Sequence, residues 1–333
     1  MSASVSGPVG VIADIGGTNV RFALCRPGKE AYAEQTLPCA DFPGPVEAAR
    51  AYLANVPAPL WPTIGAFAVA SPITGDVVTL TNHSWRFSIE DLRRALGLRH
   101  LEIVNDFVAI ALCVPRLTGD HCFQVGGGTP VPATPIGVLG AGTGLGVAVL
   151  LPEDTRWRAL PTEGGHVTMP AVDDHENAVL TVLRRRFGHV SAERILSGPG
   201  LVNLHSALAE VNGQDAGPMD PAIVTERGLA GEDRLCVETL KMFLAMLGTV
   251  AGNLVLTTGA RGGIYIAGGI VPRLTTLLPV SLFRARFEDK GRFRAYTTAV
   301  PTVVITHPYP AFLGLSALLG DLPLVSEGRG GES

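Results

Sequence analysis

The stretch Ala13-Asp14-Ile15-Gly16-Gly17-Thr18-Asn19 joins two short apolar runs, at residues 9–15 and 20–25. This pattern predicts a β-hairpin, because apolar runs of this length separated by glycines are typical of two strands and a tight turn. Two adjacent glycines also leave out the Cβ atoms that would keep a phosphate away, so that successive N–H groups can form an anion-binding nest. Asp14, at the end of the first strand, is a candidate ligand of Mg²⁺ through water. A plain hairpin turn is the alternative.

A second glycine-rich stretch, Gly-Ala-Gly-Thr-Gly-Leu-Gly at residues 140–146, has similar surroundings. Residues 139–150 repeat the order of residues 13–24, which is an apolar run, a glycine-rich turn with a threonine, and another apolar run. This weak internal repeat predicts two related halves, each with a loop that fits a phosphate. A dinucleotide-binding site is not expected, because Leu145 and Val147 stand where its third glycine would fall and a strand follows in place of a helix.

Predicted strands and helices alternate along the rest of the chain, and this alternation is typical of an α/β protein. Its 333 residues are enough for about two domains. Strands are expected at residues 64–70, 101–104, 137–139, 146–151, 263–267 and 303–306. Helices are expected at residues 45–54, 88–96, 107–114, 174–187, 199–212, 221–230, 233–257 and 311–319.

Asn105 and Asp106 directly follow the predicted strand at residues 101–104. Ligands of α/β proteins bind at the carboxyl ends of strands, and a carboxylate there can accept a proton from a substrate hydroxyl. The alternative is that the pair only caps the helix that follows. The residues alone do not decide between these two interpretations.

Three further motifs carry polar or glycine residues in loops. Glu163 and His166 flank two glycines, where both side chains can bind the hydroxyls of a polyol, and one His with one Glu makes a poor metal site. Glu193 by itself indicates no more than a surface ion pair with Arg194 or Arg186. Gly268 and Gly269 follow a predicted strand, where they can either receive a flat purine ring or begin a helix.

Composition excludes several classes of protein. The formal net charge is −4, so that there is no basic surplus for a nucleic-acid backbone. The five scattered cysteines have no C-x-x-C spacing, which argues against a disulfide framework or a zinc site and favours a reducing cytoplasm. The uncharged runs at residues 135–152 and 242–260 contain Gly and Thr, so that membrane insertion is not expected, and the first cation, Arg21, comes too late for a signal peptide.

Taken together, nine stretches resemble the bacterial glucokinase family, of the type without a zinc motif, within the actin-like and hexokinase ATPase fold. They span most of the chain and keep the order that the family has. Ala13 stands where the family often has Gly, and the cysteine cluster of the related ROK kinases is absent. The stretches are residues 13–19, 71–76, 80–89, 101–107, 140–148, 162–167, 189–204, 266–273 and 283–293.

The resemblance implies a two-domain, ribonuclease H-like α/β fold with a central cleft. It implies a small domain of residues 1–116 plus 307–333 and a large domain of residues 117–306. It also implies the ATP-dependent phosphorylation of glucose at its C6 hydroxyl to glucose 6-phosphate, with Asp106 as the general base and with closure of the domains on the sugar. A homodimer in the cytoplasm is expected, with no nucleic-acid or membrane partner.

The resemblance also assigns residues to the two substrates. A kinase of another hexose or of an amino sugar, a sugar-sensing relative without activity, and an actin-like filament or chaperone ATPase are the alternatives. The residues assigned to the sugar are Asn105, Asp106, Glu163, His166 and Glu193. Those assigned to the nucleotide are Ala13, Asp14, Ile15, Gly16, Gly17, Thr18, Gly142, Thr143, Gly268 and Gly269.

Overall fold

The first glycine-rich stretch connects β1 (Gly10–Ile15) to β2 (Asn19–Cys25) in a computed structural model that describes residues 8–154 and 156–321. The predicted hairpin is therefore confirmed, with β1 paired antiparallel to β2. The chain divides into two compact units. Unit 1 contains the described residues up to Arg116 together with those from Tyr309 onward, and unit 2 is Leu117–Pro308.

Unit 1 is built on a five-stranded sheet in the order β3-β2-β1-β4-β7. The strands β1, β4 and β7 run parallel, with Ile15 opposite Val69 and Val69 opposite Asn105. Three carboxyl ends therefore meet at one edge of this sheet. The strands are β1 (Gly10–Ile15), β2 (Asn19–Cys25), β3 (Ala31–Pro38), β4 (Ile64–Val69) and β7 (His100–Asn105), and β5 (Val77–Thr79) pairs with β6 (Arg86–Ser88) in a separate hairpin.

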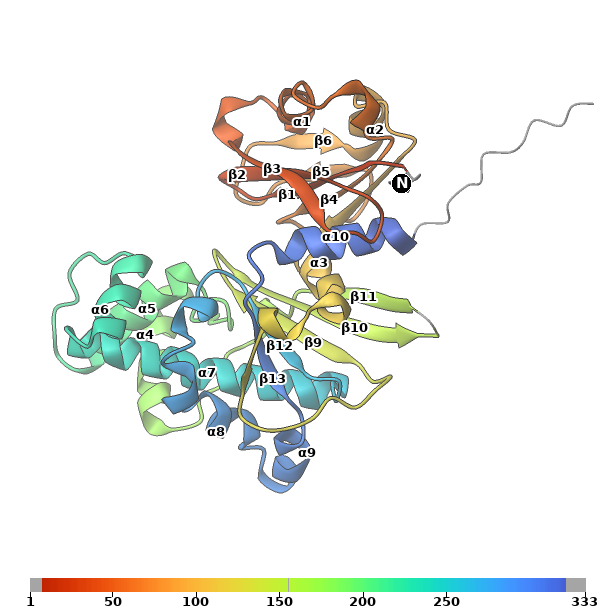
Figure 1. Cartoon of the computed structure of the whole chain (residues 1–333). Helices are drawn as coiled ribbons and strands as arrows, with labels where there is room; N and C mark the ends of the chain where they lie inside the picture. The colour runs from red at the N-terminus through yellow and green to blue at the C-terminus, as the bar shows by residue number, and fades with distance from the viewer. Residues whose placement is uncertain (1–7, 155, 322–333) are drawn as a thin grey trace, which may run out of the picture. The chain divides into compact units, whose positions relative to one another are not determined.

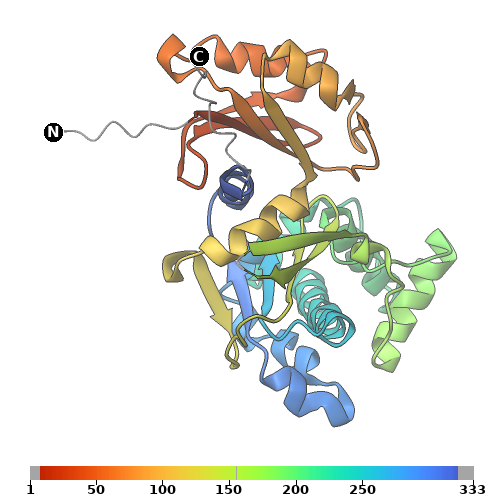
Figure 2. The ribbon, with the colours of Figure 1, turned by 90° about the vertical axis from the view of Figure 1, so that its right-hand side faces the viewer.

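Helices cover both faces of this sheet because the apolar residues of β1 alternate between the faces. Val11 and Ile15 pack with α1 (Pro45–Leu53) and α2 (Ile89–Ala95). Ile12, on the opposite face, packs with α10 and the first turns of α3. The C-terminal helix α10 returns to lie beside α3 (Figures 1 and 2). These two helices are α3 (Asp106–Cys113) and α10 (Pro310–Asp321).

Unit 2 repeats the same sheet order with one strand added at its edge. The strands β9, β12 and β13 run parallel, and β9, β10 and β11 form an antiparallel meander as β1, β2 and β3 do. The internal repeat predicted from the two glycine-rich stretches is thus confirmed. The strands, in sheet order, are β11 (Arg156–Thr162), β10 (Leu145–Glu153), β9 (Ile136–Ala141), β12 (Ile264–Ala267), β13 (Thr302–Ile305) and β8 (Cys122–Val125).

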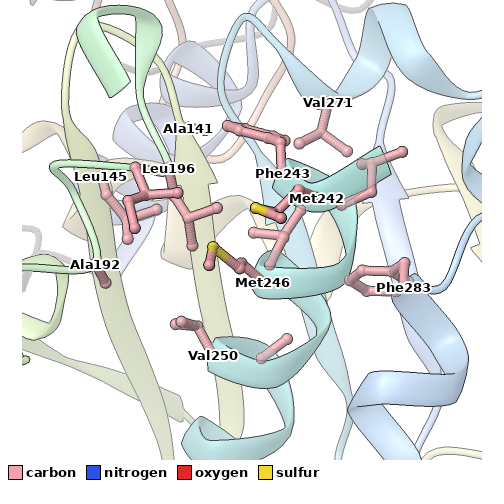
Figure 3. Packing of buried hydrophobic residues seen from close by; sticks show 14 of the residues in the cluster. Ala141, Leu145, Ala192, Leu196, Met242, Phe243, Met246, Val250, Val271 and Phe283 are labelled. Carbon is pink, nitrogen blue, oxygen red and sulfur yellow. The ribbon is translucent and has the colours of Figure 1, made fainter. Parts of the chain in front are cut away.

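The core of unit 2 forms around the long helix α7 (Arg234–Thr258) (Figure 3). Among the described residues, α7 alone is long and apolar enough to cross a membrane, but 78% of its most apolar window is buried inside the protein. Its apolar side chains therefore have protein partners. The other helices of unit 2 are α4 (Asp174–Phe187), α5 (Gly198–Val211), α6 (Pro221–Ala230), α8 (Phe283–Glu288) and α9 (Arg294–Thr298).

The sequence analysis missed the strands that lie at sheet edges. Most residues of β3 and β11 are at least partly exposed, so that neither strand has the apolar run on which the strand predictions relied. Cross-strand pairing with β2 and β10 forms these strands instead. The short strands β5, β6 and β8 were missed for the same reason.

Candidate active site

Asp14 is the penultimate residue of β1 and shares the sheet face of Ile12, the face that α3 and α10 cover. Its cross-strand neighbour Arg21 donates a hydrogen bond to its carboxylate at 3.1 Å. Burial raises the pKa of the Asp14 carboxyl, and the Arg21 guanidinium opposes that rise. A carboxylate is thus held at the edge of the sheet where the first glycine-rich loop begins.

The first glycine-rich loop is held from two sides. The backbone N–H of Cys39 donates to the Thr18 carbonyl at 2.8 Å, and the Cys39 thiol donates to the Gly16 carbonyl at 3.5 Å. On another side, a Cβ on Gly17 would lie 3.0 Å from Cβ of Asn82 and 3.1 Å from its carbonyl oxygen. A Cβ at residue 17 would therefore push the turn at residues 81–83, which packs directly against the loop, by a few tenths of an ångström.

Asn105 and Asp106 combine the two roles that the sequence left open. Asn105 caps α3, since its Oδ1 accepts the N–H of Phe107 at 2.9 Å, while its Nδ2 donates to the carbonyl of Ser71 at 3.4 Å. Asp106 is the first residue of α3 and its carboxylate accepts the same Phe107 N–H at 2.9 Å. Burial raises the pKa of Asp106 to about 6, and the nearby charge of Asp14 adds to the rise. A proton acceptor with this pKa is suited to catalysis near neutral pH.

In unit 2, Glu193 holds the second glycine-rich loop in place. Its Oε2 accepts the N–H of Leu145 at 2.8 Å. The ion pair expected with Arg194 or Arg186 is wrong, because Arg186 pairs with Glu210 and the Arg194 guanidinium lies over the ring of Phe187. Glu193 is thus bound to the loop at residues 142–145 and does not belong to a surface ion pair.

The turn Gly164–His166 packs against the same loop. The N–H of Glu193 donates to the Gly165 carbonyl at 2.9 Å, and a Cβ on Gly165 would lie only 2.0 Å from the Leu145 carbonyl oxygen. Oε2 of Glu163 lies 3.9 Å from Nε2 of His166, and both side chains are more than half exposed. Glu163 and His166 therefore flank a turn whose backbone is bonded to Glu193.

Gly268 and Gly269 also lie beside this second loop. Ala267 pairs with Gly140 in the sheet, and the N–H of Ile270 donates to the Ala141 carbonyl at 3.3 Å. Gly268 has φ 88°, and a Cβ there would lie 2.2 Å from the Ala141 carbonyl oxygen. Only a short 3-10 turn, Val271–Leu274, follows, so that the alternative of a regular helix beginning here is wrong.

Each unit thus contributes one set of predicted residues. Unit 1 holds the first glycine-rich loop with Asp14, Asn105 and Asp106. Unit 2 holds the second loop together with the other candidate residues, which are Glu163, His166, Glu193, Gly268 and Gly269. No three His, Cys, Asp or Glu side chains in residues 8–154 and 156–321 are grouped as a metal site. Two neighbours of the first loop were not predicted from the sequence, Cys39 and the turn at residues 81–83, and neither was the contact of Ser71 with that turn.

The family model for glucokinase matches residues 11–321, which is nearly the whole described chain. The chain belongs to the glucokinase family. The glucokinase of Paramagnetospirillum magneticum is 53% identical over 312 residues, covering 93% of this chain and 97% of that protein. The crystal structure of glucokinase from an Antarctic psychrotroph matches with a TM-score of 0.86 and 37% identity, over 95% of this chain and all of that one.

The fold is shared more widely than the glucokinase sequence. A ROK family glucokinase from Streptomyces griseus, solved with glucose and AMPPNP, matches with a TM-score of 0.64 over 93% of this chain and 98% of that one. Its sequence is only 16% identical, so that it supports the fold alone. The chain therefore has the actin-like ATPase fold, which glucokinases share with the ROK sugar kinases.

The raised pKa of Asp106 predicts how the stability of a variant depends on pH. Because the folded chain binds the Asp106 proton more tightly than the unfolded chain does, the unsubstituted protein loses stability as the pH rises from about 4 to about 6. Asp106→Asn removes this loss and still accepts the Phe107 N–H. Above pH 6 it should be more stable by about 1–2 kcal/mol, discounted for partial exposure, and the gain should vanish below pH 4.

Urea denaturation at pH 4, 5, 6 and 8 measures this difference. Asp76→Asn is the control of opposite sign, because hydrogen bonds from Ser88 and the Glu90 N–H lower the pKa of Asp76. That variant should lose stability at pH 8 and approach the unsubstituted protein in acid. A stability gain for Asp106→Asn that is equal at pH 4 and pH 8 would contradict the assigned pKa.

Proposed function

We propose that this chain transfers the terminal phosphoryl group of ATP to the C6 hydroxyl of glucose, giving glucose 6-phosphate and ADP, with Asp106 as the general base. The observation that carries the proposal is the partly buried Asp106 carboxylate at the carboxyl end of β7, near enough to Asp14 for its charge to raise the pKa of Asp106, in a chain of the glucokinase family. This is the edge of a parallel sheet at which α/β proteins bind ligands.

In the proposed reaction, Asp106 accepts the proton of the C6 hydroxyl while the hydroxyl oxygen forms a bond to the terminal phosphorus. The bond between that phosphorus and the bridging oxygen of ADP breaks, and the proton later leaves Asp106 for solvent. With a pKa of about 6, Asp106 is mostly ionised at pH 7 and still basic enough to assist. Phosphoryl transfer otherwise depends on positioning and on charge stabilisation.

The phosphates of ATP are assigned to Ala13–Thr18 and to Gly142 and Thr143. None of the three lysines, at residues 29, 241 and 290, lies in these stretches, so that loop N–H groups and arginines are the candidate donors to these anions. The charge of Asp14 adds to the raised pKa of Asp106, an arrangement that fits a divalent cation bound to Asp14 through water. Mg²⁺ bound with ATP would neutralise charge on the phosphates.

Glucose is assigned to Asn105, Asp106, Glu163, His166 and Glu193. Because the Leu145 N–H holds Oε2 of Glu193, its other oxygen is available to accept a sugar hydroxyl. Both amide atoms of Asn105 already have one partner, which fixes the orientation of the amide toward a ligand. The adenosine is assigned to Gly268 and Gly269, where Gly269 has open space on its Cβ side for a flat ring.

We further propose that glucose brings the two sets of residues together and that the chain works as a cytoplasmic homodimer. Catalysis needs Asp106 from unit 1 and the sugar-binding side chains from unit 2 at one glucose molecule, so that closure on the sugar would complete the site and exclude water. The five cysteines are free thiols, which fits the reducing cytoplasm that this proposal assumes.

Replacing the base tests the reaction directly. Asp106→Asn should lower kcat by at least about 100-fold, because a positioned base contributes about that much, while glucose affinity stays close to that of the unsubstituted chain. In the unsubstituted enzyme, kcat/KM should fall as the pH drops through about 6, since protonated Asp106 cannot accept a proton. A coupled assay for glucose 6-phosphate measures both, and near-normal turnover of the variant would refute the assignment.

Alanine variants of Glu163, His166 and Glu193 test the sugar site. Each removes a hydrogen-bonding partner worth roughly 1–3 kcal/mol, so that glucose should bind about 10- to 100-fold more weakly while ATP binding is largely kept. Glu210→Ala, which breaks an exposed ion-pair cluster elsewhere in unit 2, is the matched control and should bind glucose normally. Calorimetry that finds unchanged glucose affinity in all three variants would exclude this region as the sugar site.

A further inference from the structure

Ser71 lies two residues beyond the end of β4 and is buried, with 3% of its surface exposed. Its hydroxyl oxygen accepts the N–H of Thr81 at 2.8 Å and lies 3.1 Å from the Thr81 hydroxyl. The same hydroxyl donates to the Ala70 carbonyl at 2.7 Å. Ser71 therefore fastens the turn that follows β5 to the carboxyl end of the central parallel strand.

That turn is the one that packs against the first glycine-rich loop. Thr81 and Asn82 are exposed, and a Cβ on Gly17 would lie 3.0 Å from the Asn82 Cβ and 3.1 Å from the Asn82 carbonyl oxygen, which is tighter than ordinary van der Waals contact. The position of the turn therefore limits where the Gly16–Gly17 backbone can lie. If the turn moved by a few tenths of an ångström, the atoms packed against Gly17 would move with it, and the loop N–H groups would change position.

The main chain of Ser71 has a second partner, because its carbonyl accepts the Nδ2 of Asn105 at 3.4 Å. Ser71 thus contacts Asn105, the neighbour of the proposed base, through its carbonyl, and it contacts the turn that packs against the first glycine-rich loop through its hydroxyl. The two contacts can be separated experimentally, since a change of side chain leaves the carbonyl in place.

We infer that Ser71 is a positioning residue for phosphoryl transfer, whose hydroxyl holds the Thr81–Asn82 turn against the first glycine-rich loop and so sets the geometry in which ATP is bound. The inference rests on the proposed function, since it takes that loop as the phosphate site. Ser71 acts through the turn and needs no contact with either substrate. Without the hydroxyl, the Thr81 N–H loses its acceptor, and an unpaired polar group drives the turn to rearrange.

Steady-state kinetics of Ser71→Ala, with ATP and glucose varied in turn, tests this role. The variant should lose about 10-fold in kcat/KM for ATP, the equivalent of one buried hydrogen bond, while KM for glucose changes less than about twofold. Thr81→Val removes only the weaker hydroxyl contact and should lose about threefold for ATP. That threefold loss should be absent when Ser71 is already Ala, because the partner of the Thr81 hydroxyl is gone.

Ser88→Ala is the matched control, since the Ser88 hydroxyl accepts the N–H of Asp91 at 3.1 Å at the far end of the same β5–β6 hairpin. Both serine variants should melt a few degrees lower, but only Ser71→Ala should lose ATP turnover. Equal kinetics for the two variants would overturn the inference, and so would a loss at Ser71 that falls on glucose alone. If Ser71→Ala does not fold, Thr81→Val alone tests the inference: a threefold loss in kcat/KM for ATP with an unchanged KM for glucose supports it, and unchanged kinetics overturn it. An unsubstituted chain that does not phosphorylate glucose would instead refute the proposed function.

Discussion

The parallel register of β1, β4 and β7 is the constraint on which the site of unit 1 depends. In-register pairing places Ile15, Val69 and Asn105 side by side, so that whatever follows each strand emerges at one edge. The first glycine-rich loop, Ser71 and the N-terminus of α3 are the segments that emerge there. A slip of one residue in the pairing of β1 with β4 would turn Asp14 to the opposite face, away from α3.

The same edge explains why Asp106 has unusual chemistry. The fold buries its carboxyl near a second one, and both effects disfavour its charged form. This arrangement works against the stability of the folded chain at neutral pH, and it is retained where a base of intermediate pKa is useful. Glycines at residues 165 and 268 reflect a related constraint, since a Cβ at either position would collide with the backbone of Leu145 or Ala141.

Much of the fold could be predicted from the sequence, because the buried strands and the capped helices leave strong local patterns. The β1–β2 hairpin, the repeat around residues 139–150 and the helix cap at Ser88 all follow from such patterns. Edge strands such as β3 and β11 leave none, since their pairing partner and not their own composition forms them. Glu193 shows the same limit, because its bond to Leu145 spans 48 residues and no local pattern encodes it. Ser71 lies in one of the stretches that resemble the glucokinase family, but its contact with Thr81 depends on how the chain folds between the two residues, and no local pattern shows this.

We propose that the residue sets of the two units act on one glucose molecule only after the sugar brings them together. Small-angle scattering of the sugar-free and the glucose-saturated protein, with the oligomeric state held constant, tests this claim most directly, together with ATP hydrolysis measured without sugar. A clear fall in the radius of gyration on adding glucose and very slow hydrolysis in its absence are predicted. An unchanged scattering profile with fast, sugar-independent hydrolysis of ATP would contradict the account.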